Sequence, residues 1–511
     1  MAVVGTGIGG LAAALDLVGQ GCDVTLLERS AAPGGKMRET VVDGRRIDAG
    51  PTVFTMRWVF EALFADAGTA LDRHLVLHPA DILARHAWPG GAQLDLFADP
   101  ARTADAIAAF AGVADARGFQ AFCAEARRMY EVLETPFIRR PRPSALSLAR
   151  DIGSPSALLA IRPFATMWSA LARHMRDERL RQLFGRYATY CGSSPFLAPA
   201  TLMLVAHVEQ QGVWLVEGGM HRVAAALAEL VVERGGVIRY GAAVADITVA
   251  AGRVDGVRLA SGERVAADAV VVNADPAAVA AGLLGPAVRG AVPPVKPGAR
   301  SLSALTWTGL ARAEGFPLHR HTVFFSGGYR AEFDALARGT VPHEPTVYVC
   351  AQDRGTGATP PDRERLLVLV NAPANGDTRE MTATEIDRCA DRSLSLLRRC
   401  GLHLTQATLE PTPPSGFHAL FPGTGGALYG PAVHGPMATF RRPGSRTVVP
   451  GLYLAGGSTH PGAGVPMAAL SGRLAASALM ADLASTRRSP RTATPGGTSM
   501  RSATTGSTAS R

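Results

Sequence analysis

A glycine-rich turn near the start of the chain limits the possible folds more than any other feature. The apolar pair Val3-Val4 leads into Gly5, Gly7 and Gly10, which have the spacing G-x-G-x-x-G. Glycines in this pattern permit a tight turn, the close approach of a pyrophosphate and the close packing of a helix on its strand. Apolar residues then recur at helical spacing over residues 11–18. The sequence therefore predicts a strand, a turn and a helix that bind a dinucleotide.

The next segments indicate the kind of dinucleotide. Residues 23–27 form a second predicted strand, and Glu28 follows it directly. An acid at this position accepts hydrogen bonds from ribose hydroxyls and repels a 2′-phosphate, so NADP is disfavoured. Arg29 and the run Gly34-Gly35-Lys36 then offer backbone and side-chain donors for a longer phosphate contact. NAD dehydrogenases do not need this extension, whereas FAD lies elongated across its domain, so we expect FAD.

A second glycine-rich loop lies near the other end of the chain, at residues 451–465. It follows a short predicted strand, Leu452–Leu454, and Pro466 opens an apolar segment that reaches Met480. Proline is favoured in the first turn of a helix, and the positive end of that helix would face the loop. A strand, a flexible loop and a helix start suit an anionic cofactor. Taken alone, the same residues are also compatible with an ordinary loop between core elements.

Three motifs together resemble the phytoene-desaturase type of flavoprotein, a group of bacterial carotenoid desaturases among the FAD-dependent amine-oxidase-like proteins. They are E-R-x(4)-G-G-K at 28–36, D-A-G-P-T at 48–52 and G-x-Y-L-x-G-G-S-T-H-P-G-A-G-V at 451–465. The resemblance spans roughly residues 1–484. It implies an α/β fold in which a Rossmann-like FAD-binding domain carries an inserted mixed α+β substrate domain.

The resemblance also implies which residues bind FAD. Those near the N-terminus are Gly5, Gly7, Gly10, Glu28, Arg29, Gly34, Gly35, Lys36, Gly50, Pro51 and Thr52. Those expected around the flavin ring are Gly456, Gly457, Thr459, Gly462 and Val465. Val244 resembles the residue whose backbone contacts adenine, and ordinary sheet core explains it equally well.

Shorter segments are similar to one branch of this family. Residues 85–91, 183–190 and 213–221 resemble the hydroxyneurosporene (methoxyneurosporene) desaturases, which act on 1-hydroxylated acyclic carotenoids. This implies formation of the C3–C4 double bond by hydride transfer from C4 to FAD and loss of a proton from C3. The electron acceptor, oxygen or a membrane quinone, and the number of subunits are left open.

Other functions remain as alternatives. A phytoene desaturase or a carotenoid isomerase has the same fold and motifs, and amine and porphyrinogen oxidases share the fold. A non-catalytic lipid or isoprenoid escort protein is the alternative of a different class. An escort has no reason to keep the cofactor motifs and Glu28, which argues against it.

The catalytic base is not identified by a motif. His460 is a candidate for accepting the proton, and Glu217 and His221 are candidates for accepting it or for hydrogen bonding the substrate hydroxyl; each is also explained by a structural role. Residues that either line the substrate channel or belong to the core are Arg186, Tyr187 and Tyr190. The six cysteines form no C-x-x-C pair and no His/Cys spacing suggests a metal, so we expect reduced thiols and no metal.

The motifs predict a domain organisation with alternating segments. We expect the FAD-binding domain at residues 1–70, 213–285 and 445–484, the substrate domain at 71–212 and 286–444, and a disordered tail at 485–511. The middle FAD segment should contain a helix at 223–234 and a β-meander with strands at 237–240, 254–259 and 269–273.

Charge and hydropathy indicate a protein that meets a membrane from its surface. More than half of the net charge of +9 comes from five arginines in the tail, and no basic-aromatic motif points to nucleic acid. The sequence contains no run of 18 or more apolar residues, so we expect no membrane span. Residues 155–175 are apolar and follow several arginines, which predicts either an interfacial helix pair or a buried helix over the channel. We expect a cytoplasmic protein bound peripherally to the inner, photosynthetic membrane.

Overall fold

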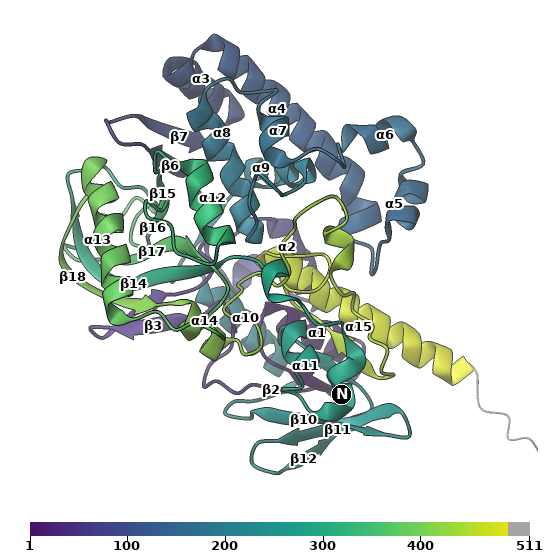
Figure 1. The fold of residues 1–511 in the computed structure, drawn as a ribbon. Helices are drawn as coiled ribbons and strands as arrows, with labels where there is room; N and C mark the ends of the chain where they lie inside the picture. Colours follow the sequence, from purple (N-terminus) through teal and green to yellow (C-terminus); the bar gives the residue numbers. More distant parts are fainter. Residues whose placement is uncertain (489–511) are drawn as a thin grey trace, which may run out of the picture.

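The computed structural model describes residues 1–488, and residues 489–511 of the predicted tail lie outside this range. A parallel sheet forms the centre of one half of the molecule (Figure 1). Its strands, in spatial order, are β19 (Leu452–Leu454), β13 (Val270–Val272), β1 (Ala2–Val4), β2 (Thr25–Leu27) and β9 (Val237–Arg239). Three separated stretches of the chain supply these strands, so the chain leaves this sheet twice and returns to it. We call this the parallel-sheet half.

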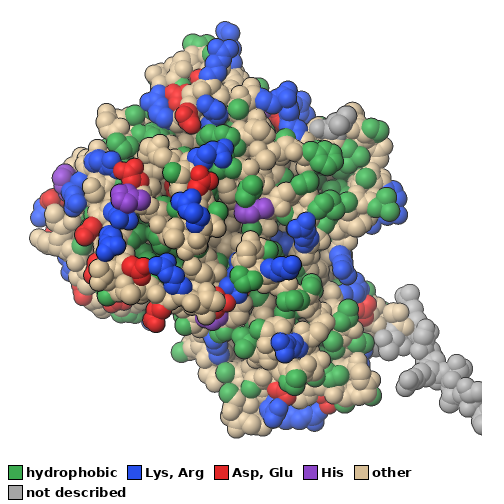
Figure 2. Space-filling model, viewed as in Figure 1, with side chains coloured by type: hydrophobic (Ala, Val, Ile, Leu, Met, Phe, Trp, Pro, Cys, Tyr) green, Lys and Arg blue, Asp and Glu red, His purple; other side chains and the backbone are tan. Residues whose placement is uncertain are grey.

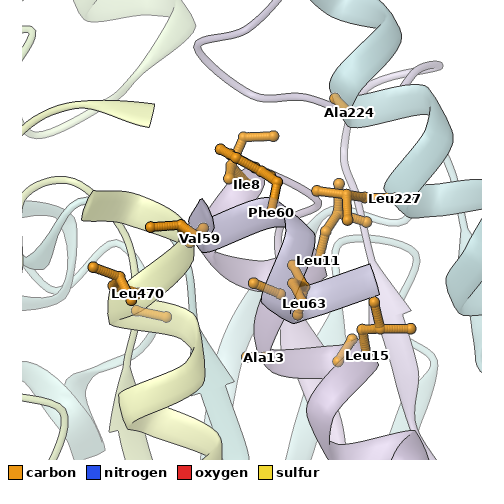
Figure 3. Close-up of a cluster of buried hydrophobic side chains, with 14 of the residues drawn as sticks. Ile8, Leu11, Ala13, Leu15, Val59, Phe60, Leu63, Ala224, Leu227 and Leu470 are labelled. Atoms are coloured by element: carbon orange, nitrogen blue, oxygen red, sulfur yellow. The ribbon is translucent and has the colours of Figure 1, made fainter. Parts of the chain in front are cut away.

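Helix α1 (Ile8–Gly19) is the central helix of this half. Its buried side chains pack among three other helices, α2 (Arg57–Asp66), α10 (His221–Glu233) and α15 (Val465–Arg488), as Figure 3 shows. The contact with α15 is so close that a Cβ atom added to Gly472 would lie 2.1 Å from the carbonyl oxygen of Gly9. Glycine is therefore required where the two helices meet, and the two glycine-rich loops are held side by side.

The helix α15 also has the composition of a possible membrane span. Within residues 1–488, its portion Val465–Ser485 is the one helix long and apolar enough to cross a bilayer. Its residues Ala469, Ala475 and Leu479 are fully buried and pack in the same cluster as α1. This part of α15 therefore packs as a core helix of the parallel-sheet half.

The predicted β-meander is partly wrong. An antiparallel three-stranded sheet does form, from β10 (Val244–Ala250), β11 (Arg253–Leu259) and β12 (Arg264–Ala266). However, β9 and β13, which we assigned to the meander, belong to the parallel sheet, because β13 is buried on both faces. We missed β10 as a strand, and register shifts interrupt its pairing with β11.

Two predicted boundaries also change. Residues 485–488, assigned to a disordered tail, continue the helix α15. Residues 286–292, assigned to the substrate domain, pack on the three-stranded sheet, since Val288, Ala291 and Val292 share a buried cluster with Val257. The remaining boundaries stay a prediction.

A seven-stranded mixed sheet forms the centre of the other half, which we call the mixed-sheet half. In spatial order its strands are β18 (His403–Thr412), β14 (Ser303–Glu314), β17 (Glu364–Ala372), β16 (Val347–Ala351), β15 (His321–Phe324), β6 (Ile82–Ala87) and β7 (Gln93–Phe97). Only β15 and β6 pair in parallel. Alternating residues face α13 (Ala383–Arg399) on one side, so the opposite face is free to line a cavity.

A helical region begins beside β6 and β7 and extends away from the sheet as far as α5 and α6 (Figure 1). They are α3 (Pro100–Ala111), α4 (Val113–Leu133), η2 (Glu134–Ile138), α5 (Ala145–Ile152), α6 (Pro155–Ala160), α7 (Met167–Leu171), α8 (Glu178–Gly185), η3 (Arg186–Cys191), η4 (Ala200–Met203) and α9 (Leu204–Gln210). The remaining elements are β3 (Glu39–Val42), β4 (Arg45–Asp48), η1 (Leu71–Arg73), β5 (Leu77–Pro79), β8 (Trp214–Val216), α11 (Pro276–Ala280), η5 (Pro286–Ala291), η6 (Pro297–Ala299), α12 (Tyr329–Ala337), α14 (Pro414–Leu420) and η7 (Thr439–Arg441).

Candidate active site

One cavity of about 990 Å³ joins the two halves of the molecule. In the parallel-sheet half it is lined by the turn after β1, the loops around residues 28–39 and 49–56, and the start of α15. In the mixed-sheet half it is lined by the inner face of the seven-stranded sheet and by η3, α9 and α12. A ligand in the first part can therefore contact a ligand in the second without crossing solvent.

The glycine turn after β1 forms a concave backbone surface that residues with side chains could not form. We call this surface, together with the loop around Lys36, the glycine cradle. Gly5 has a φ of +95°, and a Cβ atom on Gly7 would lie 2.5 Å from the side-chain oxygen of Asn273. Gly10 does not line the cavity; a Cβ atom there would lie 2.2 Å from the carbonyl oxygen of Gly5. The first two glycines thus give a phosphate access to the backbone, and the third brings helix and strand together.

Glu28 is fixed at the end of β2 by hydrogen bonds. It is buried and accepts bonds from the backbone and side chain of Thr6, both at 2.8 Å, and from the backbone of Ser30 at 2.9 Å. It also lines the cavity, where its position suits the hydroxyl donors of a ribose. Thr6 lies at a variable position of the glycine motif, so the motif did not single it out.

The loop around Lys36 continues the cradle. A Cβ atom on Gly34 would lie 2.2 Å from the carbonyl oxygen of Met37, and one on Gly50 would lie 2.0 Å from that of Lys36. The Lys36 ammonium lines the cavity, donates to the carbonyl of Leu428 at 2.6 Å, and has its pKa lowered by burial. Predicted residues that also line this part are Arg29, Gly35, Pro51, Thr52 and Val244.

The C-terminal loop forms the opposite wall. Gly456, Gly457 and Val465 line the cavity as predicted positions, whereas Thr459 and Gly462 do not. The Thr459 hydroxyl instead lies behind the loop and donates to the carbonyl of Gly456 at 2.6 Å. The sequence pattern predicted that these residues surround the cofactor, but it could not tell which of them line the cavity.

Arg442 supports this loop from behind and was missed by the sequence analysis. Its buried guanidinium donates to the carbonyl of Gly457 at 3.0 Å, of Tyr429 at 2.8 Å and of Pro431 at 3.0 Å. Three carbonyls converging on one cation fix the loop without a carboxylate. Arginine is abundant throughout this chain, so its position alone carried no signal.

Two of the catalytic candidates lie away from the cavity. His460 is buried, with its Nε2 2.9 Å from the carbonyl oxygen of Phe137, and burial lowers its pKa to about 4. Glu217 is exposed and lies 3.0 Å from His78. His221 does line the cavity, but its Nε2 lies 2.9 Å from the carbonyl oxygen of Pro33, so it anchors the loop that follows Glu28. None of the three faces the mixed-sheet part of the cavity.

The mixed-sheet part of the cavity has apolar walls interrupted by a group of polar side chains. Arg186 and Tyr190 line it, whereas Tyr187 lies behind them and donates to Glu209 at 2.6 Å. The hydroxyl of Tyr348 lies 2.7 Å from the Nδ1 of His321. These residues come from distant parts of the chain, so only the fold brings them together. Among the described residues, no group of three or more His, Cys, Asp and Glu could hold a metal.

Comparisons with known proteins agree with this arrangement. Residues 8–480 match the family of flavin-containing amine oxidoreductases. The chain is 55% identical to a hydroxyneurosporene desaturase of Rubrivivax gelatinosus, over 99% of this chain and 97% of that protein. It is 46% identical to a hydroxyneurosporene desaturase of Cereibacter sphaeroides, over 95% of this chain and 98% of that protein.

Solved structures show the same fold at low sequence identity. Putrescine oxidase bound to putrescine superposes with a TM-score of 0.58 and 15% identity, covering 94% of this chain and 98% of that one. Because the family match spans residues 8–480, the chain belongs to the flavin-containing amine oxidoreductase family. Its cofactor is FAD, for which the glycine cradle, Glu28 and the C-terminal loop provide a fitting site.

Proposed function

We propose that this protein is an FAD-dependent carotenoid desaturase that forms the C3–C4 double bond of 1-hydroxylated acyclic carotenoids, such as 1-hydroxyneurosporene. The observation that carries this proposal is that one continuous cavity contains both the glycine-rich surface suited to a dinucleotide and the largely apolar part lined by the mixed sheet. We call the second part the chamber. Similarity to hydroxyneurosporene desaturases over nearly the whole chain supports the choice of substrate.

The residues proposed to hold FAD are those of the cradle that line the cavity. They are Gly5, Gly7, Glu28, Arg29, Gly34, Gly35, Lys36, Gly50, Pro51, Thr52, Val244, Gly456, Gly457 and Val465. Gly10 and Thr459 act on the shape of this surface from behind it, and Gly462 does not line the cavity. When bound, FAD supplies an acceptor for a hydride from carbon.

The protein itself contributes position, charge and the exclusion of water. Hydrogen leaves C4 as a hydride, with both electrons of the C4–H bond. C3 then loses a proton to a weak base, and the electron pair of the C3–H bond becomes the second bond between C3 and C4. The N-terminal end of α15, which lines the cavity at Val465, stabilises negative charge that develops nearby. Apolar walls such as Val323 and Leu369 hold the substrate carbons and keep water out.

The alternatives fit the cavity less well. A phytoene desaturase handles a pure hydrocarbon, which cannot hydrogen bond with the guanidinium of Arg186 that lines the cavity and whose Nε is buried without a partner. An isomerase would leave the mass of its substrate unchanged, so product analysis separates it. An escort protein would not need a cradle in which Gly7, Gly34 and Gly50 each exclude a side chain.

The proposal also includes peripheral contact with a membrane, because the substrate is dissolved in lipid. The surface over α5 and α6 exposes Leu146 by 82% and Phe164 by 88%, and apolar side chains gather there in Figure 2. Arg139, Arg142 and Arg150 are exposed close by in sequence, which suits anionic lipid headgroups. We place the protein on the cytoplasmic side of the inner, photosynthetic membrane, with oxygen or a membrane quinone as the electron acceptor.

Product analysis with three carotenoids tests the function. FAD-loaded protein in liposomes is offered phytoene, neurosporene and 1-hydroxyneurosporene separately, and products are identified by mass and absorbance. We expect the loss of two hydrogens from the hydroxylated carotenoid only. Conversion of phytoene would make the protein a general desaturase, and a geometric change without mass loss would make it an isomerase.

A further inference from the structure

Four residues form a polar group at the boundary between the two parts of the cavity. They are Arg186, Tyr190, His321 and Tyr348, which we call the terminal polar cluster, and all four line the cavity. Arg186 donates to the Tyr190 hydroxyl at 2.7 Å, and the Tyr348 hydroxyl lies 2.7 Å from His321. The charge of Arg186 acts on the pKa of the other three, so the four residues lie close together.

The cluster has hydrogen-bonding capacity that the protein does not use. A guanidinium carries five N–H donors, and within residues 1–488 the Arg186 side chain makes one hydrogen bond and no ion pair. Its Nε and the Nε2 of His321 are buried without a partner. Glu209, the carboxylate in this region, accepts a hydrogen bond from Tyr187 at 2.6 Å and attracts the Arg186 charge, but the two side chains form no hydrogen bond with each other, so the Arg186 donors stay free. Buried polar groups are normally satisfied, so these atoms point to a ligand.

The position of the cluster defines the chemistry of that ligand. The Tyr348 hydroxyl also lies 2.7 Å from the side-chain oxygen of Thr52, and Thr52 belongs to the segment proposed to contact FAD. The polar cluster is thus next to the reacting centre rather than at the far end of the chamber. A substrate that uses it must carry an oxygen within a few ångströms of the bond that reacts.

A 1-hydroxylated carotenoid has this arrangement. Its oxygen-bearing carbon C1 is two bonds from C3, so the oxygen necessarily lies close to the C3–C4 bond. Resting on the proposed function, we propose that the terminal polar cluster binds the C1 oxygen of the substrate, with Arg186 as the principal donor, and thereby places C3 and C4 at the flavin. Arg186 is a specificity-determining residue that selects oxygenated over purely hydrocarbon ends.

The same chemistry would let the cluster bind either a hydroxyl or an ether oxygen. Arginine only donates hydrogen bonds, and both a tertiary alcohol and a methoxy group accept them. Glu217, which we predicted as a candidate for this contact, is exposed outside the cavity. The Nε2 of His221, the other candidate, lies 2.9 Å from the carbonyl oxygen of Pro33. The terminal polar cluster therefore takes the place that the sequence analysis gave to these two residues.

Equilibrium binding tests this assignment apart from turnover. Holoenzyme with fully reduced FAD, which cannot accept a hydride, is titrated with neurosporene and with 1-hydroxyneurosporene in the same detergent, and tryptophan quenching by the polyene is followed. We expect the hydroxylated carotenoid to bind about tenfold more tightly, as for one hydrogen bond from a charged donor. Arg186→Met should bring this ratio close to one by weakening the hydroxylated ligand alone.

Two further variants keep the test decisive. Arg186→Met leaves the buried Glu209 carboxylate without the nearby positive charge, which could make that variant fold poorly. Arg186→Met/Glu209→Gln removes both charges, and it should show the same loss of preference for the hydroxylated carotenoid. Tyr187→Phe changes a neighbouring buried hydroxyl that does not line the cavity, and it should keep the tenfold preference.

Equal weakening of both carotenoids, or no preference in the wild type, would overturn the assignment. It would also be overturned if Arg186→Met shifted the flavin absorbance and FAD affinity but kept the preference, because the guanidinium would then serve the cofactor. In each of these cases, conversion of 1-hydroxyneurosporene by the wild type would leave the proposed function intact. Failure of that conversion would reject the function itself.

Discussion

The hydroxyl of Tyr348 lies 2.7 Å from the side-chain oxygen of Thr52, and this bond connects the two halves of the molecule inside the cavity. Tyr348 is on β16 of the mixed sheet, whereas Thr52 lies in a loop of the parallel-sheet half. The part of the cavity proposed to hold the substrate and the part proposed to hold FAD are therefore positioned relative to each other by a direct contact between their walls. Catalysis that depends on carbon placement benefits from such a fixed relation.

The contact between α1 and the turn before it should not tolerate a side chain at Gly10. Replacing Gly10 by Ala places a methyl group 2.2 Å from the carbonyl oxygen of Gly5, so helix and strand must move apart. We expect a loss of about 2 kcal/mol in stability and poor FAD retention, measured by thermal unfolding and by flavin content. Gly19→Ala, at the other end of α1 with no atom within 4 Å, should be neutral or slightly stabilising. Full FAD content in Gly10→Ala would contradict the role of this contact.

Arg442 should be required for the shape of the C-terminal loop. Arg442→Met leaves the carbonyls of Gly457, Tyr429 and Pro431 without their buried donor, which costs about 3 kcal/mol. Weaker FAD binding should accompany this loss, and titration of the apoprotein with FAD measures it. Arg441→Met, a change at the exposed neighbour, is the control and should bind FAD normally. Equal FAD affinity in both variants would show that the loop holds its shape without Arg442.

His460 should make the fold sensitive to mild acid. Its pKa in the folded protein is about 4 because of burial, below the value of 6.5 expected when it is exposed. The unfolded chain then binds more protons between these two pH values, so the stability contributed by neutral His460 is complete above pH 6.5 and falls as the pH drops towards 4. Lowering the pH from 7 to 5 should cost about 2 kcal/mol from this residue.

The variant His460→Gln isolates that effect. Glutamine can still donate to the Phe137 carbonyl, but it does not titrate. Denaturant unfolding at pH 7 and pH 5 should therefore show a smaller acid-induced loss in the variant, while the buried residues His86 and His321 continue to contribute theirs. An unchanged difference between the two pH values would mean that His460 is charged in the folded state.

The surface over α5 and α6 should dominate binding to vesicles. Phe164→Ser and Leu146→Ser each remove one exposed apolar group, and each should lower partitioning into anionic vesicles about tenfold. The control is Val448→Ser, an equally exposed apolar residue shortly before β19 in the parallel-sheet half. Sedimentation with vesicles of phosphatidylglycerol measures the difference. If Val448→Ser had the same effect, binding would not depend on this surface.

Local motifs made the shape of the glycine-rich turn predictable from the sequence, whereas the assignment of its residues to FAD stays a prediction. The roles of Gly5, Gly7 and Gly10 follow from backbone geometry within one turn, and the structure places them as this geometry requires. The strand Leu452–Leu454 and the helix after it were also predicted, since an apolar run and a proline mark them. Such features depend on neighbours in the chain, which the sequence displays directly.

The substrate side was not predictable in the same way. Arg186 and Tyr348 line the same cavity because η3 and β16 both face it, although the two residues are 162 positions apart in the chain. His460 shows the opposite error: it lies within the glycine-rich loop 451–465, yet its ring nitrogen lies 2.9 Å from the carbonyl oxygen of Phe137, away from the cavity. Adjacency in sequence does not fix the direction of a side chain, and distance in sequence does not prevent contact.

Anaerobic single turnover tests the central claim most directly. FAD-loaded protein is mixed with a limiting amount of 1-hydroxyneurosporene without oxygen or quinone, and flavin absorbance and carotenoid products are measured together. We predict one flavin reduced for each C3–C4 double bond formed, because the two electrons have no other acceptor. Product formation without flavin bleaching, or bleaching without a new double bond, would contradict the account.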